Sequence, residues 1–79
     1  MKVTVLFFAS ARDAVGMSET VVDLSNGSSI DNLIASNELA PLKPFLPSMR
    51  FAINEEFSPN DAALSDGDVV AVIPPVSGG

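Results

Sequence analysis

The last residues of the sequence are the ones whose types and order best suit a chemical role. They follow Pro74-Pro75, and proline cannot continue a strand ladder, so we expect the chain to leave its sheet there. The residues after Pro75 reach about 15 Å when fully extended. Glycine has no Cβ, so Gly78 and Gly79 fit a narrow channel and leave a terminal carboxylate unhindered to attack. We therefore predict a projecting tail in which Gly79 is the reacting residue. The predicted tail consists of Val76, Ser77, Gly78 and Gly79.

The rest of the chain offers few groups for catalysis. It contains no cysteine and no histidine, which excludes disulfides, thiolate zinc sites, cysteine nucleophiles and imidazole bases. The carboxylate pairs Glu55-Glu56 and Asp66/Asp68 fall on predicted turns. We interpret them as solvated turn residues and expect no metal site, because no further hard oxygen ligands converge on them. The serines lack an activating base, so serine hydrolysis is not expected.

The charge balance restricts the class of partner. Ten acidic and four basic residues give a net charge of −6. A nucleic-acid backbone would be repelled by this charge, whereas an electropositive protein surface would be attracted. No apolar run approaches the ~20 residues of a membrane-spanning helix, and the first residues lack the features of a signal peptide. We therefore expect a cytoplasmic protein that binds neither nucleic acid nor a membrane.

The length of 79 residues predicts one domain, with a body at residues 1–75 and the tail at residues 76–79. A chain this short buries only about 60 % of the surface that its unfolded form exposes, so the core must be thin. The content of 47 % hydrophobic and 18 % charged residues nevertheless argues against disorder.

Runs of β-branched and aromatic residues, bounded by turn residues, predict four strands. The first two are expected to form an antiparallel pair. The last is apolar throughout and too short for a helix, which suits a strand buried on both faces in the middle of a sheet. The predicted strands are residues 2–8, 18–24, 49–54 and 69–73.

Apolar residues at helical spacing predict a main helix at residues 28–39. Ser28 is its expected N-cap and Pro41 ends it, which leaves residues 40–47 irregular. Two shorter capped turns are predicted, at residues 10–16 with Ser10 as cap, and at residues 58–64. This order of elements predicts an α+β fold, a mixed sheet with one main helix packed on one face and with the first and last strands as central parallel neighbours.

Alternation along the first and last strands leaves an apolar set of side chains on the sheet face opposite the helix. This set contains Leu6, Phe8, Val69 and Ile73. Two interpretations are open: residues 42–47 fold over this face, or a partner protein covers it. The partner is favoured, because so short a chain has little else to cover both faces of its sheet.

Three stretches of the sequence carry a resemblance to a known family. They are VLFFASARDAVG at residues 5–16, FAINEEF at residues 51–57 and LSDGDVVAVIPPVSGG at residues 64–79. Together they resemble the MoaD/ThiS-type ubiquitin-like sulfur carriers, and within this family they are most similar to the small subunits of molybdopterin synthase. The ending PPVSGG after a strand is the most specific element.

The resemblance implies a ubiquitin-like β-grasp fold and a carrier that is not catalytic by itself. A ubiquitin-activating-type adenylyltransferase would use ATP to adenylate Gly79, and sulfur would replace the adenylate to give a thiocarboxylate. The thiocarboxylate would donate sulfur to cyclic pyranopterin monophosphate in a pocket of the large subunit of molybdopterin synthase, within a heterotetramer. No permanently bound cofactor is implied. The family's hydrophobic contact face falls on Phe8, Phe57 and Ile73.

Three alternatives remain open from the sequence. The thiamine-pathway sulfur carrier shares the fold, the Gly-Gly ending and the adenylation. A ubiquitin-like modifier would be conjugated to lysine side chains through Gly79. An ordinary β-grasp interaction module would carry the tail incidentally.

Overall fold

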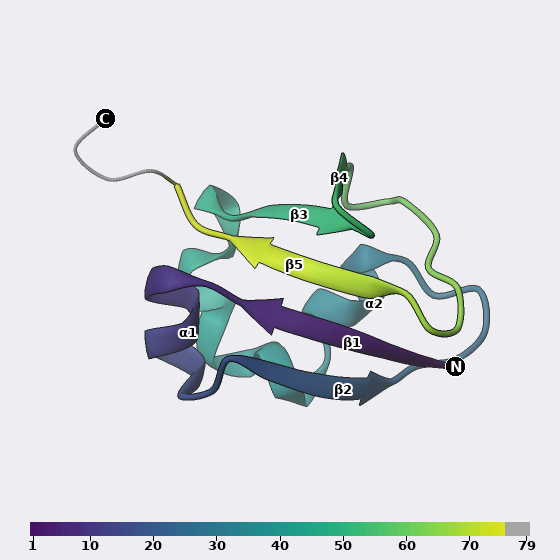
Figure 1. Cartoon of the computed structure of the whole chain (residues 1–79), viewed down its shortest axis with the longest axis horizontal. Helices are drawn as coiled ribbons and strands as arrows, with labels where there is room; N and C mark the ends of the chain where they lie inside the picture. Colours follow the sequence, from purple (N-terminus) through teal and green to yellow (C-terminus); the bar gives the residue numbers. More distant parts are fainter. Residues whose placement is uncertain (76–79) are drawn as a thin grey trace.

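The computed structural model describes residues 1–75, and in this part of the chain one five-stranded sheet stands in front of a helical layer (Figure 1). None of the helices among these residues is long and apolar enough to cross a membrane. In chain order the elements are β1 (Lys2–Phe7), α1 (Ala9–Val15), β2 (Glu19–Asp23), α2 (Ile30–Ile34), the 3₁₀-helix η1 (Asn37–Ser48), β3 (Arg50–Ile53), β4 (Glu56–Ser58) and β5 (Val69–Ile73).

The strands follow the order β2-β1-β5-β3-β4 across the sheet. The first strand β1 and the last strand β5 are parallel neighbours in its middle, and the other three pairs are antiparallel. The predicted mixed sheet, its central parallel pair and the antiparallel first pair are therefore confirmed. The prediction that the last strand is buried on both faces is wrong: Val70 and Val72 are fully buried, whereas Val69 is 37 % exposed. The helical layer covers one face only.

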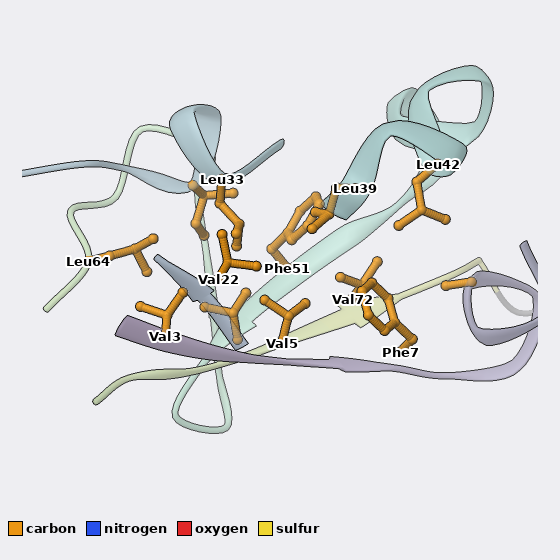
Figure 2. Close-up of a cluster of buried hydrophobic side chains, with 13 residues drawn as sticks. Val3, Val5, Phe7, Val22, Leu33, Leu39, Leu42, Phe51, Leu64 and Val72 are labelled. Carbon is orange, nitrogen blue, oxygen red and sulfur yellow. The ribbon is translucent and has the colours of Figure 1, made fainter. Parts of the chain in front are cut away.

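The hydrophobic core lies between the sheet and the helical layer (Figure 2). Every second residue of β1 points into it, as the alternation predicts, and no polar or charged side chain is buried within residues 1–75. Burial of one such apolar side chain stabilises the fold by roughly 1.5–3 kcal/mol relative to exposure. The core residues include Val3, Val5, Phe7, Val70 and Val72 of the sheet and Leu33, Leu39 and Leu42 of the helical layer.

The first predicted helical turn is α1, which begins before the expected cap. Phe8 occupies the N-cap position without a side-chain hydrogen bond, and Ser10 lies inside the helix, so the prediction of Ser10 as cap is wrong. The predicted end at Gly16 is confirmed: this residue has φ of 85°, and its N–H donates to the carbonyl oxygen of Arg12 at 2.8 Å. Glycine adopts this left-handed conformation without steric cost.

The main helix is shorter than predicted. Helix α2 ends at Ile34, and its N-cap is Ser29 rather than Ser28, with the Ser29 N–H donating to Asn32 Oδ1 at 2.8 Å. Residues 37–39, expected to end the main helix, and residues 40–47, expected to be irregular, lie in η1 instead. Proline has no N–H and clashes with the preceding turn of an α-helix, so repeated prolines restrict this segment to short 3₁₀ turns. The prolines inside η1 are Pro41, Pro44 and Pro47.

Strand β4 was not predicted. Asn54 and Glu55 form a two-residue turn that joins β3 to β4, with φ values of 50° and 72°. The helical turn predicted after Ser58 is wrong: the chain runs on without a helix and bridges back to α2, where Ser29 pairs with Ala63. Pro59 follows β4 directly, and a proline there ends the strand rather than starting a helix.

Candidate functional site

One face of the sheet is turned away from the helical layer, and we call it the outer face. Strand register places Leu6 opposite Ala71, Ala71 opposite Ala52, and Ala52 opposite Phe57. Residues that are paired across strands point to the same side of a sheet. An apolar row therefore crosses the outer face from β1 to β4.

The three residues predicted as partner contacts all lie on the outer face. Phe8 is 48 % exposed and Phe57 is 59 % exposed, and half-buried Ile73 stands in register with Arg50 of β3. The position of Phe57 had followed from the family resemblance alone, since β4 was not predicted. Its register with Ala52 brings it to the same side as the other two.

Residues 42–47 do not fold over the outer face, so the interpretation in which they cover it is wrong. Leu42 is fully buried in the core on the opposite side of the sheet, and η1 packs against α1 and α2. Large apolar side chains on the outer face consequently stay exposed, and such a patch is typical of an interaction surface. The exposed members are Phe8, Val21, Phe57 and Val69.

The outer face has a hollow of about 440 Å³ beside Phe8. Its floor includes the methyl group of Ala71, which is smaller than the side chains around it. The hollow was not predicted, although the alanines at positions 52 and 71 on the outer side of two neighbouring strands were the available signal. The lining residues are Leu6, Phe8, Asn54, Glu55, Val69 and Ala71.

Asn54 fixes the rim of this hollow by its hydrogen bonds. Its Nδ2 donates to Asp68 Oδ1 at 3.0 Å, and its Oδ1 accepts the N–H of Val69 at 3.0 Å. The Asn54 N–H in turn donates to the Val69 carbonyl oxygen at 2.8 Å. The turn between β3 and β4 is thereby tied to the start of β5. Sequence reasoning assigned Asn54 no role; the preference of asparagine for positive φ in hairpin turns could have indicated one.

The sheet ends where the predicted tail begins. Because β1 and β5 are parallel, Phe8 and Ile73 lie at the same end of the sheet, and the chain leaves there through Pro74 and Pro75 (Figure 1). The departure from the sheet at the two prolines is confirmed. The tail residues Val76, Ser77, Gly78 and Gly79 lie outside the described residues.

Sequence comparison connects this arrangement with a family. The model of the ThiS family matches residues 5–79, almost the whole chain. The chain belongs to the ThiS family. It is 40 % identical to the molybdopterin synthase sulfur carrier subunit of Chlamydomonas reinhardtii, with all of both chains covered.

Solved structures agree on the fold. SAMP1 from Haloferax volcanii superposes with a TM-score of 0.92 over all of both chains, at 20 % identity. A chain of the complex of subunits 1 and 2 of the molybdopterin-converting factor from Helicobacter pylori gives a TM-score of 0.71 and 28 % identity, also over all of both chains. The α+β prediction is confirmed, and the fold is the ubiquitin-like β-grasp.

Proposed function

We propose that this chain is the sulfur-carrier subunit of a molybdopterin synthase, with Gly79 as the group that carries the sulfur. The observation that carries the proposal is the 40 % identity, over both complete chains, to a protein of that name. The sulfur-carrier ending PPVSGG, and an apolar outer face at the end of the sheet where the chain leaves, support it.

The chemistry starts from a carboxylate, which is a poor electrophile. A carboxylate oxygen of Gly79 attacks the α-phosphorus of ATP on an adenylyltransferase of the ubiquitin-activating type, and pyrophosphate leaves. Sulfide, as HS⁻, then attacks the carbonyl carbon and expels AMP, which is a good leaving group. The product is a C-terminal thiocarboxylate. The chain itself supplies a reagent rather than a catalytic base, in agreement with its lack of histidine and cysteine.

Sulfur transfer takes place on a partner. The tail enters the active site of the large subunit, where cyclic pyranopterin monophosphate receives the sulfur, and hydrolysis returns Gly79 to a carboxylate. Two such donations build the dithiolene of molybdopterin. The structure of the Helicobacter pylori complex contains subunits 1 and 2 of a molybdopterin-converting factor, which supports a large-subunit partner; we propose a heterotetramer.

The outer face is the proposed docking surface for the large subunit. Phe8, Phe57 and Ile73 lie on it together, and Phe8 and Ile73 are at the end of the sheet where the tail leaves. Docking of this surface thus fixes where residues 76–79 start. The tail reaches about 15 Å when fully extended, so the catalytic pocket of the large subunit must lie within about that distance of the point where the chain leaves the sheet.

Reconstitution tests the function. The carrier is incubated with an adenylyltransferase of the ubiquitin-activating type, ATP and a sulfur source, and its intact mass is measured before and after addition of the large subunit and pterin substrate. We expect one oxygen to be replaced by sulfur, and the sulfur to be lost as molybdopterin forms. Transfer only to a thiazole precursor would favour the thiamine pathway, and an isopeptide bond to an added lysine-bearing protein would favour a modifier. The absence of both a thiocarboxylate and a conjugate would leave only the interaction module.

A further inference from the structure

The hollow on the outer face is large enough to receive a side chain of a partner. Ala71 and Ala52 are neighbours in register at the centre of the sheet, and both carry only a methyl group. Leu6 of β1, Phe8 at the N-cap of α1 and Val69 of β5 line the hollow together with Ala71. The hollow of about 440 Å³ therefore has apolar walls and an open mouth.

Residues with unusual backbone angles lie around this hollow. Within residues 1–75 only Ala9, Asn54 and Glu55 combine a side chain with positive φ, at 47°, 50° and 72°. Asn54 and Glu55 line the hollow, and Ala9 directly follows Phe8, which also lines it. Two-residue hairpin turns of this kind favour Asn followed by Gly, so Glu55 occupies a position that suits glycine better. Strain of this kind clusters at functional sites, where it holds a side chain in place.

Glu55 supplies the charge of the site. The Asn54 amide is already engaged by Asp68 and Val69. The Glu55 carboxylate, in contrast, makes no hydrogen bond or ion pair with any residue of the described part of the chain. It is exposed at the rim of an otherwise apolar hollow. An aliphatic stem that ends in a cation matches this combination, because lysine and arginine bury their stems and keep the charged head at a polar edge.

We propose that the hollow receives a lysine or arginine side chain of the large subunit, with its stem on Leu6 and Ala71 and its cationic head on Glu55. This proposal rests on the proposed function, since it names the occupant of that docking surface. The net charge of −6 favours a cationic partner surface in general. Glu55 adds one negative charge at a defined position, the rim of the hollow. Arginine is also enriched among the residues that dominate interface energies.

The experiment compares Glu55→Gln with Glu38→Gln. Both changes remove one negative charge, but Glu38 is exposed on η1, in the layer behind the sheet. Association and dissociation rates are measured against the immobilised large subunit. We expect Glu55→Gln to speed dissociation about tenfold, because the bound large subunit would cover the hollow and its rim, and losing one member of a charge pair that the complex desolvates acts on the dissociation rate. Glu38→Gln should change it less than twofold.

A second pair of variants tests the shape of the hollow. Ala71→Leu fills it, whereas Ala40→Leu adds the same bulk at an exposed position of η1, in the layer behind the sheet. Ala71→Leu should weaken binding about tenfold or more, and Ala40→Leu should leave it near the wild-type value. Melting temperatures of all variants report on folding.

Glu55→Gly separates a binding role from a structural one. Glycine tolerates φ of 72° better than glutamate, so this variant should melt at a higher temperature and still dissociate faster than wild type. If Glu55→Gln and Glu38→Gln dissociate alike while wild type binds, the proposed occupant is wrong and the carrier function stands. If the wild-type chain does not bind the large subunit at all, both proposals are overturned.

Discussion

The guanidinium carbon of Arg50 lies 4.2 Å from the centroid of the Phe57 ring. Arg50 comes from β3, where it stands opposite Ile73 in register, and Phe57 comes from the short edge strand β4. A cation over an aromatic face is stabilising by about 0.5–1 kcal/mol at an exposed site. Arg50 thus links two of the three proposed contact residues and restricts the orientation of the Phe57 ring.

Arg50→Met should weaken binding of the large subunit about two- to fivefold, because the Phe57 ring loses the contact that orients it. Arg12→Met is the matched control, since it removes the same charge from an exposed position on α1, in the helical layer. Titration calorimetry gives the two dissociation constants. Equal affinities for both variants would show that the Arg50–Phe57 contact contributes nothing to docking.

Truncation of two phenylalanines should separate docking from folding. Phe8 is 48 % exposed on the outer face, whereas Phe51 is 1 % exposed in the core. Phe8→Ala should cost about 2 kcal/mol of binding free energy, roughly thirtyfold in affinity, with a small change in melting temperature. Phe51→Ala should cost about 3–5 kcal/mol of folding free energy. Measured melting curves and affinities that rank the two in the opposite order would show that Phe8 belongs to the core.

Removal of Gly79 should abolish adenylation without disturbing the fold. Gly79 lies outside the described residues, and the core of the described part of the chain is formed by residues between Val3 and Val72. The reaction needs a carboxylate at the right reach, so one added residue should be as harmful as one removed. ATP–pyrophosphate exchange with the activating enzyme measures this step, and thermal unfolding serves as the control. Persistent exchange with the deletion variant would mean that another group is adenylated.

The sequence was most informative where one periodicity decides the structure. The alternation along β1 separates Val3, Val5 and Phe7 from Leu6 and Phe8, and the structure keeps that separation. The central position of β5 followed from its apolar composition. The prediction that β5 is buried on both faces was wrong, because burial of the second face would need helices that the rest of the described chain does not place there.

The remaining errors come from interactions between distant residues. Strand β4 is only three residues long and forms because it pairs with β3. No local propensity predicts so short a strand. The hollow is lined by residues that lie far apart in the sequence, such as Leu6, Asn54 and Ala71, and these meet only in the folded sheet. Helix α2 ends early and η1 packs against it, and local apolar spacing does not predict that contact. For the candidate site, alternation identified Phe8 and Ile73, whereas Phe57 needed the family resemblance and the hollow beside Glu55 needed the structure.

Replacement of Asn54 should loosen the connection between β3, β4 and β5. Asn54→Ala removes both side-chain hydrogen bonds and places an ordinary side chain at φ of 50°. Asn54→Gly removes the same bonds but tolerates that backbone angle. We expect both to lower the free energy of unfolding in urea, by about 1 kcal/mol for the lost bonds, with Asn54→Ala the less stable of the two. Faster hydrogen exchange at the Val69 amide should accompany both changes, because this N–H loses its bond to Asn54 Oδ1. Unchanged exchange there would show that this side-chain bond does not protect the amide.

Salt should slow the encounter of the carrier with the large subunit more than it speeds their separation. The net charge of −6 attracts an electropositive surface over a distance, and at physiological ionic strength salt screens this attraction beyond a Debye length of about 8 Å. Contacts of Phe8 and Phe57 inside the complex are apolar and respond little to salt. Stopped-flow measurements from low to high ionic strength should therefore show a steep fall in the association rate and a nearly constant dissociation rate. Equal association rates at both extremes would mean that the acidic surface serves solubility, and that docking depends on the outer face alone.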